Sequence, residues 1–431
     1  MTNQRTAGGS GRGPSGKPIE RASRTGTTRG LTKIPAAVKS VPEDEQYTVG
    51  KVKRRLKYRI FNLGVGLDLP LLTIVLVLMA VGLVMLFSAS YANAYYHYGD
   101  SYTFIQKQAG FAVVGVIAML LISVIDYHQF HKMAPWIYAG SVVLLVLVLV
   151  LKGTDMAPVK GGANRWINIA GVEFQPSELA KFALVIMLAH IISKAGDQIK
   201  TFKGGVVPCL LCAGIIAGLV VAEKHISATI IILIISCIVM FVGGIRPRWF
   251  AALAGLGGVA LTYLVFFTDK FAYALERLQG WIDPFNADAY QTIQSLYAIG
   301  SGQLLGVGLG QSRQKYLYLP EPQNDFIFAI VCEELGFVGA LIIILLFVAL
   351  IWRGVVISIN AKDKFGMLIG LGMTFTVGVQ AVLNICVVTN AIPNTGISLP
   401  FFSYGGTALL ILLGEMGVLL SVSRGSYMEK T

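Results

Sequence analysis

The chain has 431 residues, of which 55% are hydrophobic and only 13% are charged, and its formal net charge is +12. This balance excludes an ordinary soluble globular protein, because several apolar runs reach the roughly 20 helical residues that cross a bilayer. The composition predicts an all-α polytopic membrane protein.

The positive charge is concentrated at the start of the chain. Residues 1–60 hold fourteen Lys or Arg and four acidic residues, in a stretch rich in Gly, Ser, Thr and Pro. Such a segment is predicted to be a disordered cytoplasmic tail whose charge suits an anionic membrane surface. No apolar core follows the first basic residues, so it is not a signal peptide. Nothing aromatic or structured supports nucleic-acid binding, and residues 61–425 are predicted to form the transmembrane domain.

Ten membrane spans are predicted in the remainder. The basic cluster of residues 51–59 precedes the first span and places the N-terminus in the cytoplasm. Ten crossings return the C-terminus to the cytoplasm, so the protein is predicted to be a multi-pass membrane protein with both termini in the cytoplasm. The predicted spans are about 69–90, 107–125, 134–151, 178–194, 205–222, 226–244, 249–268, 326–352, 366–389 and 402–422.

A 57-residue segment, 269–325, separates the seventh and eighth predicted spans and falls on the outer face. Long ordered loops are usually functional. Residues 290–295 have the pattern of a short amphipathic helix. The glycines of 306–310 suit either a phosphate cradle or flexible turns, and the sequence leaves both open.

Polar residues at membrane boundaries mark candidate sites on this outer side. Glu178 and Lys181 lie three apart near the start of a predicted helix and therefore share a face. They are interpreted either as a self-satisfied ion pair or as a cation offered to a pyrophosphate, with Glu178 orienting it. Arg165, just upstream, is a second basic residue kept on the outer face, where it could meet an anionic ligand.

Two other acidic stretches admit two interpretations each. The turn 223–229 carries Glu, Lys and His and is either a solvated hairpin or part of a site. Asp325 follows Pro322 and precedes an apolar run, so it is either a helix N-cap or a functional carboxylate. Further along that helix, Glu333 and Glu334 are expected to form interhelical hydrogen bonds.

The segment 392–407 contains two prolines and three glycines at a membrane boundary. Irregular backbone is tolerated there only where it is buried in protein or lines a watery cavity. Gly405 and Gly406 are expected to let the last helix pack closely on a neighbour.

The residues of this segment also resemble a known family. Pro393-x-Thr-Gly-x-x-Leu-Pro-Phe-Phe-Ser-Tyr-Gly-Gly-Thr407 is similar to the signature of the shape, elongation, division and sporulation (SEDS) proteins, which include FtsW, RodA and SpoVE. The resemblance covers about residues 65–422. Further matching stretches are Gln175-Pro-Ser-Glu-x-x-Lys181, Tyr290-Gln-x-x-Gln-Ser295, Gly306-x-Gly-x-Gly310, Gln314-Lys315, Leu319-Pro-Glu-x-x-x-Asp325-Phe-Ile-Phe328 and Glu333-Glu334-Leu-Gly336.

The resemblance implies a ten-helix inverting glycosyltransferase of the FtsW/SpoVE branch that polymerises lipid II into peptidoglycan strands during cell division or sporulation. It implies a class B penicillin-binding protein and other division or sporulation proteins as partners. Asp325 is the essential carboxylate that it implies. The predicted role of Asp325 is to accept the proton of the acceptor's GlcNAc 4-hydroxyl as this attacks C1 of the donor MurNAc.

The departing undecaprenyl pyrophosphate needs nearby cations. The residues predicted to bind substrate or pyrophosphate are Lys181, Arg165, Glu178, Arg277, Lys315 and Glu321. A structural role is predicted for the motif residues Pro400, Ser403, Tyr404, Gly405 and Gly406. No ligand cluster demands a metal, and a divalent cation, Mg or Mn, is left open.

Two departures from the family pattern affect these expectations. The chain has residues 224–229 where relatives carry a Pro-Asp-x-Gly-Thr-like turn, so no catalytic role is transferred to that turn. Gln323 and Asn324 replace a common His-Thr. The alternative function is a lipid II flippase or lipid-linked transporter, which broken helices would also fit. The absence of an obvious inverted repeat and the outer position of the acidic site favour the transferase.

Overall fold

The computed structural model describes residues 66–158, 164–169, 171–252, 255, 281–284 and 289–426. The tail 1–60, most of the predicted span 249–268 and Arg277 lie outside these residues. In chain order the elements are α1 (Leu69–Tyr98), α2 (Thr103–Val124), α3 (His128–Val150), β1 (Ile167–Ile169), β2 (Val172–Phe174), α4 (Pro176–Ala195), the short helices η1 (Gly196–Lys200) and η2 (Phe202–Val206), α5 (Val207–Ala222), α6 (Ile226–Val242), α9 (Tyr290–Gly302), α10 (Ile327–Ile359), α11 (Lys364–Val388) and α12 (Gly406–Gly425).

The described residues confirm a helical, multi-pass membrane protein. Among the described residues, eight helices are long and apolar enough to cross a membrane, and α6 is a shorter apolar helix. All nine correspond to predicted spans, because long apolar runs specify spanning helices strongly. The predicted total of ten and the full extent of the large outer loop depend on residues outside the described ranges.

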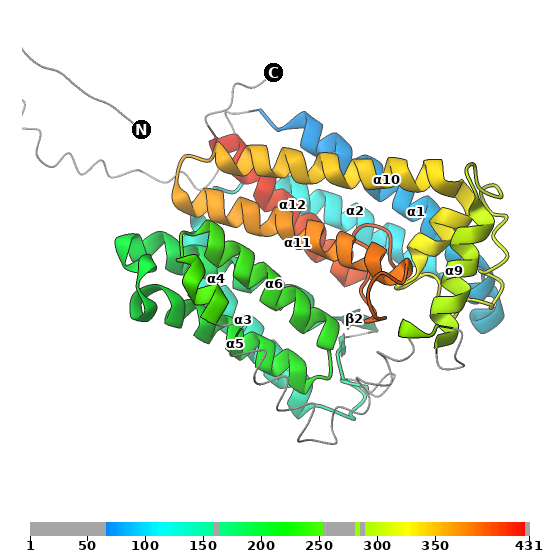
Figure 1. Cartoon of the computed structure of the whole chain (residues 1–431), viewed down its shortest axis with the longest axis horizontal. Helices are drawn as coiled ribbons and strands as arrows, with labels where there is room; N and C mark the ends of the chain where they lie inside the picture. The colour runs from blue at the N-terminus through cyan, green and yellow to red at the C-terminus, as the bar shows by residue number, and fades with distance from the viewer. Residues whose placement is uncertain are drawn as a thin grey trace, which may run out of the picture. The chain divides into compact units, whose positions relative to one another are not determined.

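Helices α11 and α12 lie at the centre of the bundle (Figure 1). α12 packs along α2, whereas α11 packs along α10 and also contacts α4 and α6. In each of α11 and α12, 67% of the most apolar window is buried inside the protein. The irregular segment 389–405 joins these two central helices, and α11 holds its backbone, since Asn384 donates to Ile397 O and Gln380 donates to Ser398 O.

The start of α10 is clamped by α9 and the loop that follows it (Figure 1). A Cβ atom at Gly302 would lie 1.9 Å from the carbonyl oxygen of Cys332, so only glycine permits this contact. Gly336 interrupts α10 with a φ of 66°, a left-handed conformation that glycine adopts readily. The loop pairs with the backbone there, since Val307 N donates to Glu333 O at 2.9 Å and Phe337 N donates to Gln303 O at 2.9 Å.

A two-stranded antiparallel hairpin, β1–β2, precedes α4 and was not among the predicted elements. Its three-residue strands are too short to leave a periodic pattern in the sequence. The hairpin is joined to the start of α12, because Thr407 Oγ1 donates to the backbone oxygen of Glu173 at 3.0 Å. The hairpin connects Arg165 to α4 and so fixes the position of Arg165 relative to that helix.

Candidate functional site

Asp325 lies one residue before the N-cap of α10. The cap is Phe326, which forms no side-chain cap hydrogen bond, so Asp325 does not cap this helix. Its backbone oxygen accepts a 2.7 Å hydrogen bond from Asn384 Nδ2 of α11, and the same amide donates to Ile397 O at 2.6 Å. Asn384 therefore ties the residue that bears the carboxylate to both α11 and the segment that follows it.

The carboxylate of Asp325 faces a tight turn of that segment. Gly396 adopts a φ of 65°, and a Cβ atom there would lie 3.0 Å from Asp325 Oδ2. A side chain at position 396 would be strained by its backbone and would crowd the carboxylate. Glycine at this position leaves one side of the half-buried carboxylate open.

The Ser403–Tyr404 pair joins the loop before α10 to the start of α12. Ser403 Oγ donates to Asn324 O at 2.6 Å and accepts from Leu399 N at 2.7 Å. Tyr404 N donates to Gln323 O at 2.9 Å. Gln108 of α2 completes the connection, donating to Ser403 O at 3.3 Å and accepting from Gly405 N at 3.1 Å. These bonds fix the backbone on both sides of Asp325.

Gly406 begins α12, and a Cβ atom there would lie 2.1 Å from Phe111 Cδ2. The expected close approach of the last helix to a neighbour is therefore observed, with α2 as the neighbour. Pro400 lies in the same irregular segment and lines a pocket beside α12.

Lys181 is buried on α4, with 2% of its surface exposed. Its Nζ lies 2.9 Å from Glu178 Oε2 and donates to Gln380 Oε1 of α11 at 2.9 Å. The ion pair expected from the spacing of Glu178 and Lys181 is thus present. An ammonium has three N–H donors, and these contacts use two of them.

Arg165 lies beside the turn that joins α5 and α6. Its Nη2 donates to the backbone oxygen of Lys224 at 2.9 Å. Its positive charge also acts on Asp325, Glu223 and His225, lowering the pKa of each. Arg165 is therefore the cation that these three groups share.

The pKa of Asp325 is raised to about 6. Burial is the main cause, the negative charge of Glu321 adds to it, and Arg165 opposes both. A carboxylate with a pKa near 6 is largely ionised at neutral pH and is a stronger base than an ordinary aspartate. Glu321 itself is exposed and accepts a 2.8 Å hydrogen bond from Asn324 Nδ2, near enough for its charge to act on Asp325.

The turn between α5 and α6 is not a solvated hairpin, and that interpretation is wrong for two of its residues. Glu223 is 1% exposed and His225 is 7% exposed. His225 Nδ1 lies 3.2 Å from Ser177 Oγ on α4. Burial, followed by the charges of Arg165 and Lys181, lowers the pKa of His225 to about 3, so the imidazole is neutral at physiological pH.

The burial of Glu223 was not predicted from the sequence. Neither of its carboxylate oxygens has a hydrogen-bond partner among the described residues. Burial raises the pKa of Glu223 to about 8, against the opposing charge of Arg165, so the residue is largely protonated at neutral pH. The signal available in the sequence was the position of an acid, a base and a histidine between two wholly apolar helices.

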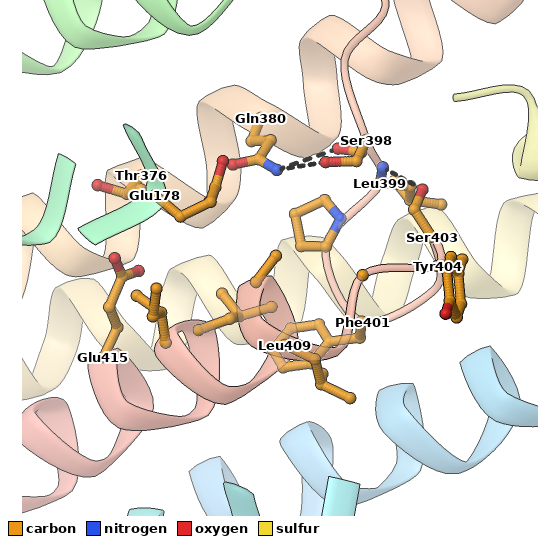
Figure 2. Close-up of a pocket in the computed structure, with 15 residues that line it drawn as sticks. Glu178, Thr376, Gln380, Ser398, Leu399, Phe401, Ser403, Tyr404, Leu409 and Glu415 are labelled. Atoms are coloured by element: carbon orange, nitrogen blue, oxygen red, sulfur yellow. Dashed lines mark hydrogen bonds between the residues drawn. The ribbon is translucent and has the colours of Figure 1, made fainter. Parts of the chain in front are cut away.

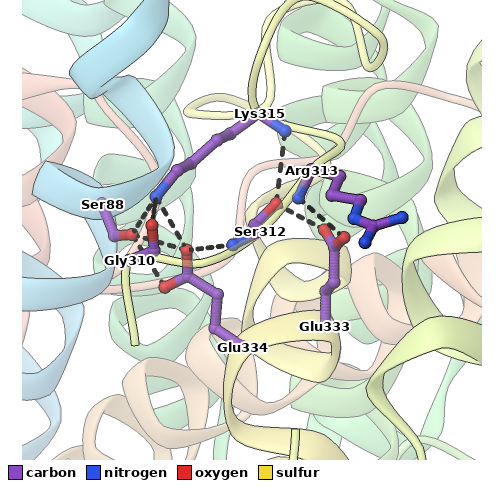
Figure 3. A network of polar contacts seen from close by, with 7 residues as sticks. All are labelled: Ser88, Gly310, Ser312, Arg313, Lys315, Glu333 and Glu334. Carbon is purple, nitrogen blue, oxygen red and sulfur yellow. Dashed lines mark hydrogen bonds and ion pairs between the residues drawn. The ribbon is translucent and has the colours of Figure 1, made fainter. Parts of the chain in front are cut away.

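Lys315 belongs to a buried polar network with Ser88, Gly310 and Glu334. Figure 3 shows its ammonium between α1 and the start of α10, where it contacts Glu334 Oε1 at 3.0 Å, Ser88 Oγ at 3.2 Å and Gly310 O at 2.6 Å. All three N–H donors are used. Lys315 is 2% exposed, and no described contact joins it to Asp325. Its three donors are used inside the protein, so the structure gives no support for pyrophosphate binding by Lys315, which stays a prediction.

The same network confirms the interhelical hydrogen bond expected for Glu334, whereas the described bonds of the Glu333 side chain go to loop residues and not to another helix. Ser88 Oγ of α1 bonds both carboxylate oxygens of Glu334 at 2.7 Å, and Arg313 N donates to Glu333 Oε1 at 2.9 Å. Ser312 also contacts both acids, through its hydroxyl to Glu333 and its N–H to Glu334. The two acids join the outer loop to the membrane helices.

A pocket of about 40 Å³ lies beside this region between α4, α11 and α12 (Figure 2). Glu178, Gln380, Ser398, Tyr404 and Glu415 are among the residues that line it. Within the described ranges, no three His, Cys, Asp or Glu side chains come together as a metal-binding group. A divalent cation would instead need substrate phosphates as additional ligands, as Mg²⁺ commonly does.

Comparisons with known proteins agree with one another. The family profile described as "Cell cycle protein" (FtsW, RodA, SpoVE) matches residues 69–428. Stage V sporulation protein E of Bacillus subtilis is 42% identical over 83% of this chain and 97% of its own length. A "Probable peptidoglycan glycosyltransferase FtsW" of Geobacter sp. is 36% identical over the same shares of each chain.

Solved structures show the same fold. One, described as "Structural coordination of polymerization and crosslinking by a peptidoglycan synthase complex", has a TM-score of 0.69 and 25% identity over 84% of this chain and 99% of the other. The rod shape determining protein RodA of Thermus thermophilus has a TM-score of 0.63 and 25% identity, with the same coverage.

Proposed function

Because this chain belongs to the FtsW, RodA and SpoVE family of cell cycle proteins, we propose that it is a membrane-embedded peptidoglycan glycosyltransferase that polymerises lipid II during cell division or sporulation. The observation that carries the proposal is the environment of Asp325. Its backbone is held by α11 and the 389–405 segment, its carboxylate is half-buried, and its pKa is raised to about 6.

Asp325 is the general base of the proposed reaction. Its carboxylate takes the proton of the acceptor's GlcNAc 4-hydroxyl while that oxygen forms a bond to C1 of the donor MurNAc. The bond from C1 to the pyrophosphate breaks at the same time, and the configuration at C1 inverts. A base works best when its pKa lies near the operating pH, and burial raises the pKa of Asp325 toward that range.

The leaving pyrophosphate gains negative charge, which Arg165 and Lys181 stabilise. Arg165 acts on the groups of the α5–α6 turn and on Asp325 together. Lys181 is held by Glu178 and Gln380 and has a third N–H for a phosphate oxygen. Glu223, which is largely protonated at neutral pH, adds little negative charge to compete with the anion.

A divalent cation, if one takes part, would be held mainly by the departing pyrophosphate. Mg²⁺ or Mn²⁺ would then neutralise developing charge on the leaving group. A class B penicillin-binding protein is the proposed partner, in keeping with the peptidoglycan synthase complex whose structure resembles this chain. The outer face is the proposed side of the reaction, with both termini in the cytoplasm.

Replacing Asp325 with Asn tests the proposal. The purified protein with its partner synthase is incubated with labelled lipid II, and the glycan strands are separated on a gel. D325N is expected to lose strand formation while its unfolding temperature stays within a few degrees of the wild type. The matched control is Asp197→Asn, at an exposed acid on η1, which should retain full activity.

The result that would overturn the assignment is polymerisation by D325N at the wild-type rate. The transporter alternative has its own assay, since lipid II reconstituted on one side of a proteoliposome reports flipping. Movement of lipid II across the bilayer without any strand formation by the wild type would favour the transporter over the transferase.

A further inference from the structure

Glu415 is a buried acid in the middle of α12, outside the groups used in the proposed reaction. It is 3% exposed, and its Oε2 has no hydrogen-bond partner among the described residues. α12 is one of the helices apolar enough to cross the membrane. Ionisable residues in such helices are costly and usually face a partner or a watery cavity.

The carboxylate of Glu415 faces the pocket between α4, α11 and α12. Figure 2 shows it on the same side as Glu178 and Thr376, and all three line the pocket. The space is large enough for an ion with some of its waters, because a single water needs only about 10–15 Å³ of free volume. An unpartnered carboxylate oxygen therefore borders a space that can hold its partner.

The charges around this pocket do not balance. Lys181 neutralises Glu178, because the Lys181 Nζ lies 2.9 Å from the Glu178 carboxylate. Lys181 also donates a hydrogen bond to Gln380. No described ion pair involves Glu415. The pocket thus carries one unmatched negative charge when Glu415 is ionised, and a buried unpaired charge is strongly unfavourable.

Protonation at Oε1 would remove the charge, but Oε2 would still have no hydrogen-bond partner among the described residues. The oxygen atoms at the pocket wall suit a hard cation instead. Thr376 Oγ1 donates to Gly372 O and keeps its own lone pairs, while Ser398 contributes a hydroxyl and a backbone oxygen that also accept from Gln380.

We propose that this pocket binds a monovalent cation, such as Na⁺, on the carboxylate of Glu415. One unmatched carboxylate calls for a single positive charge. In membrane transporters, irregular backbone beside broken helices is where such ions are coordinated, and here Ser398–Gly405 forms one wall. The bound cation braces the segment whose Ser403 and Tyr404 hold the loop before Asp325.

Thermal unfolding of the purified full-length protein tests the site. The unfolding temperature is measured in NaCl, KCl or choline chloride at equal ionic strength. NaCl or KCl is expected to raise it by about 2–4 °C in a saturable way, whereas choline, which is too large for the pocket, should not. Glu415→Gln keeps the side-chain shape, removes the charge and should abolish the response, and the control Asp197→Asn should keep it.

An unfolding temperature that is the same in all three salts would overturn the proposal, as would an equal response in the wild type and Glu415→Gln. A stability that depends on pH but not on the cation would show that Glu415 binds a proton only, which also overturns it. Should Glu415→Gln fail to fold, equilibrium dialysis of the wild type with ²²Na⁺ decides: about one ion per chain supports the site and none refutes it.

Discussion

The pH dependence of strand formation should report the charge on Asp325, and Glu321 provides a way to move it. With a pKa of about 6, only about one tenth of Asp325 is ionised at pH 5, compared with about nine tenths at pH 7. The initial rate of lipid II polymerisation should therefore fall about tenfold as the pH is lowered from its plateau to 5.

Replacing Glu321 with Gln removes the second cause of the raised pKa. The acid limb of the rate profile should move to lower pH, since Glu321 raises the pKa of Asp325. Glu321 is exposed, so water and salt screen its charge and the shift should stay well below one pH unit. At pH 5 and low salt, this corresponds to a rise in rate on the order of twofold over the wild type.

Raising the salt concentration tests whether this effect is electrostatic. At 1 M salt the screening length falls to about 3 Å, so the shift of the acid limb caused by Glu321→Gln should largely vanish. Asp197→Asn removes an equally exposed acid from η1 and should leave the profile unchanged. A wild-type rate that does not change between pH 5 and 8 would refute the assignment of Asp325 as the titrating base. A Glu321→Gln limb that moves to higher pH would refute the electrostatic argument.

Two predictions concern stability. Glu223 has a pKa of about 8 in the fold, against an ordinary value of 4.5, so the folded state binds more protons and stability falls as the pH rises between these values. Glu223→Gln should unfold at a higher temperature than the wild type at pH 9 and at the same temperature at pH 5; a parallel pH dependence of the two proteins would contradict this. Lys315→Met leaves Glu334 buried without its cation and should cost about 3–5 kcal/mol of unfolding free energy, measured by denaturant titration. Adding Glu334→Gln should recover part of that loss, and a double variant as unstable as the sum of its parts would argue against the pair.

The spanning helices could be predicted from the sequence because hydrophobicity and length act locally. α10 begins at Ile327, where the predicted span began at 326, and α4 begins at Pro176, two residues before the predicted span of 178–194. The break at Gly336 could not be predicted in the same way. It depends on the loop after α9, whose Gly306 N would lie 2.2 Å from a Cβ at that position, and no local pattern reports this contact.

The candidate site likewise has one part that sequence spacing predicts and another that depends on tertiary packing. The pairing of Glu178 with Lys181 follows from helical spacing, so one turn of sequence was enough to predict it. Lys315 and Glu223 have no such local determinant, and the surroundings of both depend on tertiary packing. Lys315, which looked like a ligand for an anion, is neutralised by an acid nineteen residues away, whereas Glu223, which looked like a solvated turn residue, is buried beside Arg165. A charge in a membrane protein is available to substrate only when no side chain from another helix has already neutralised it, and that depends on tertiary packing rather than on sequence spacing.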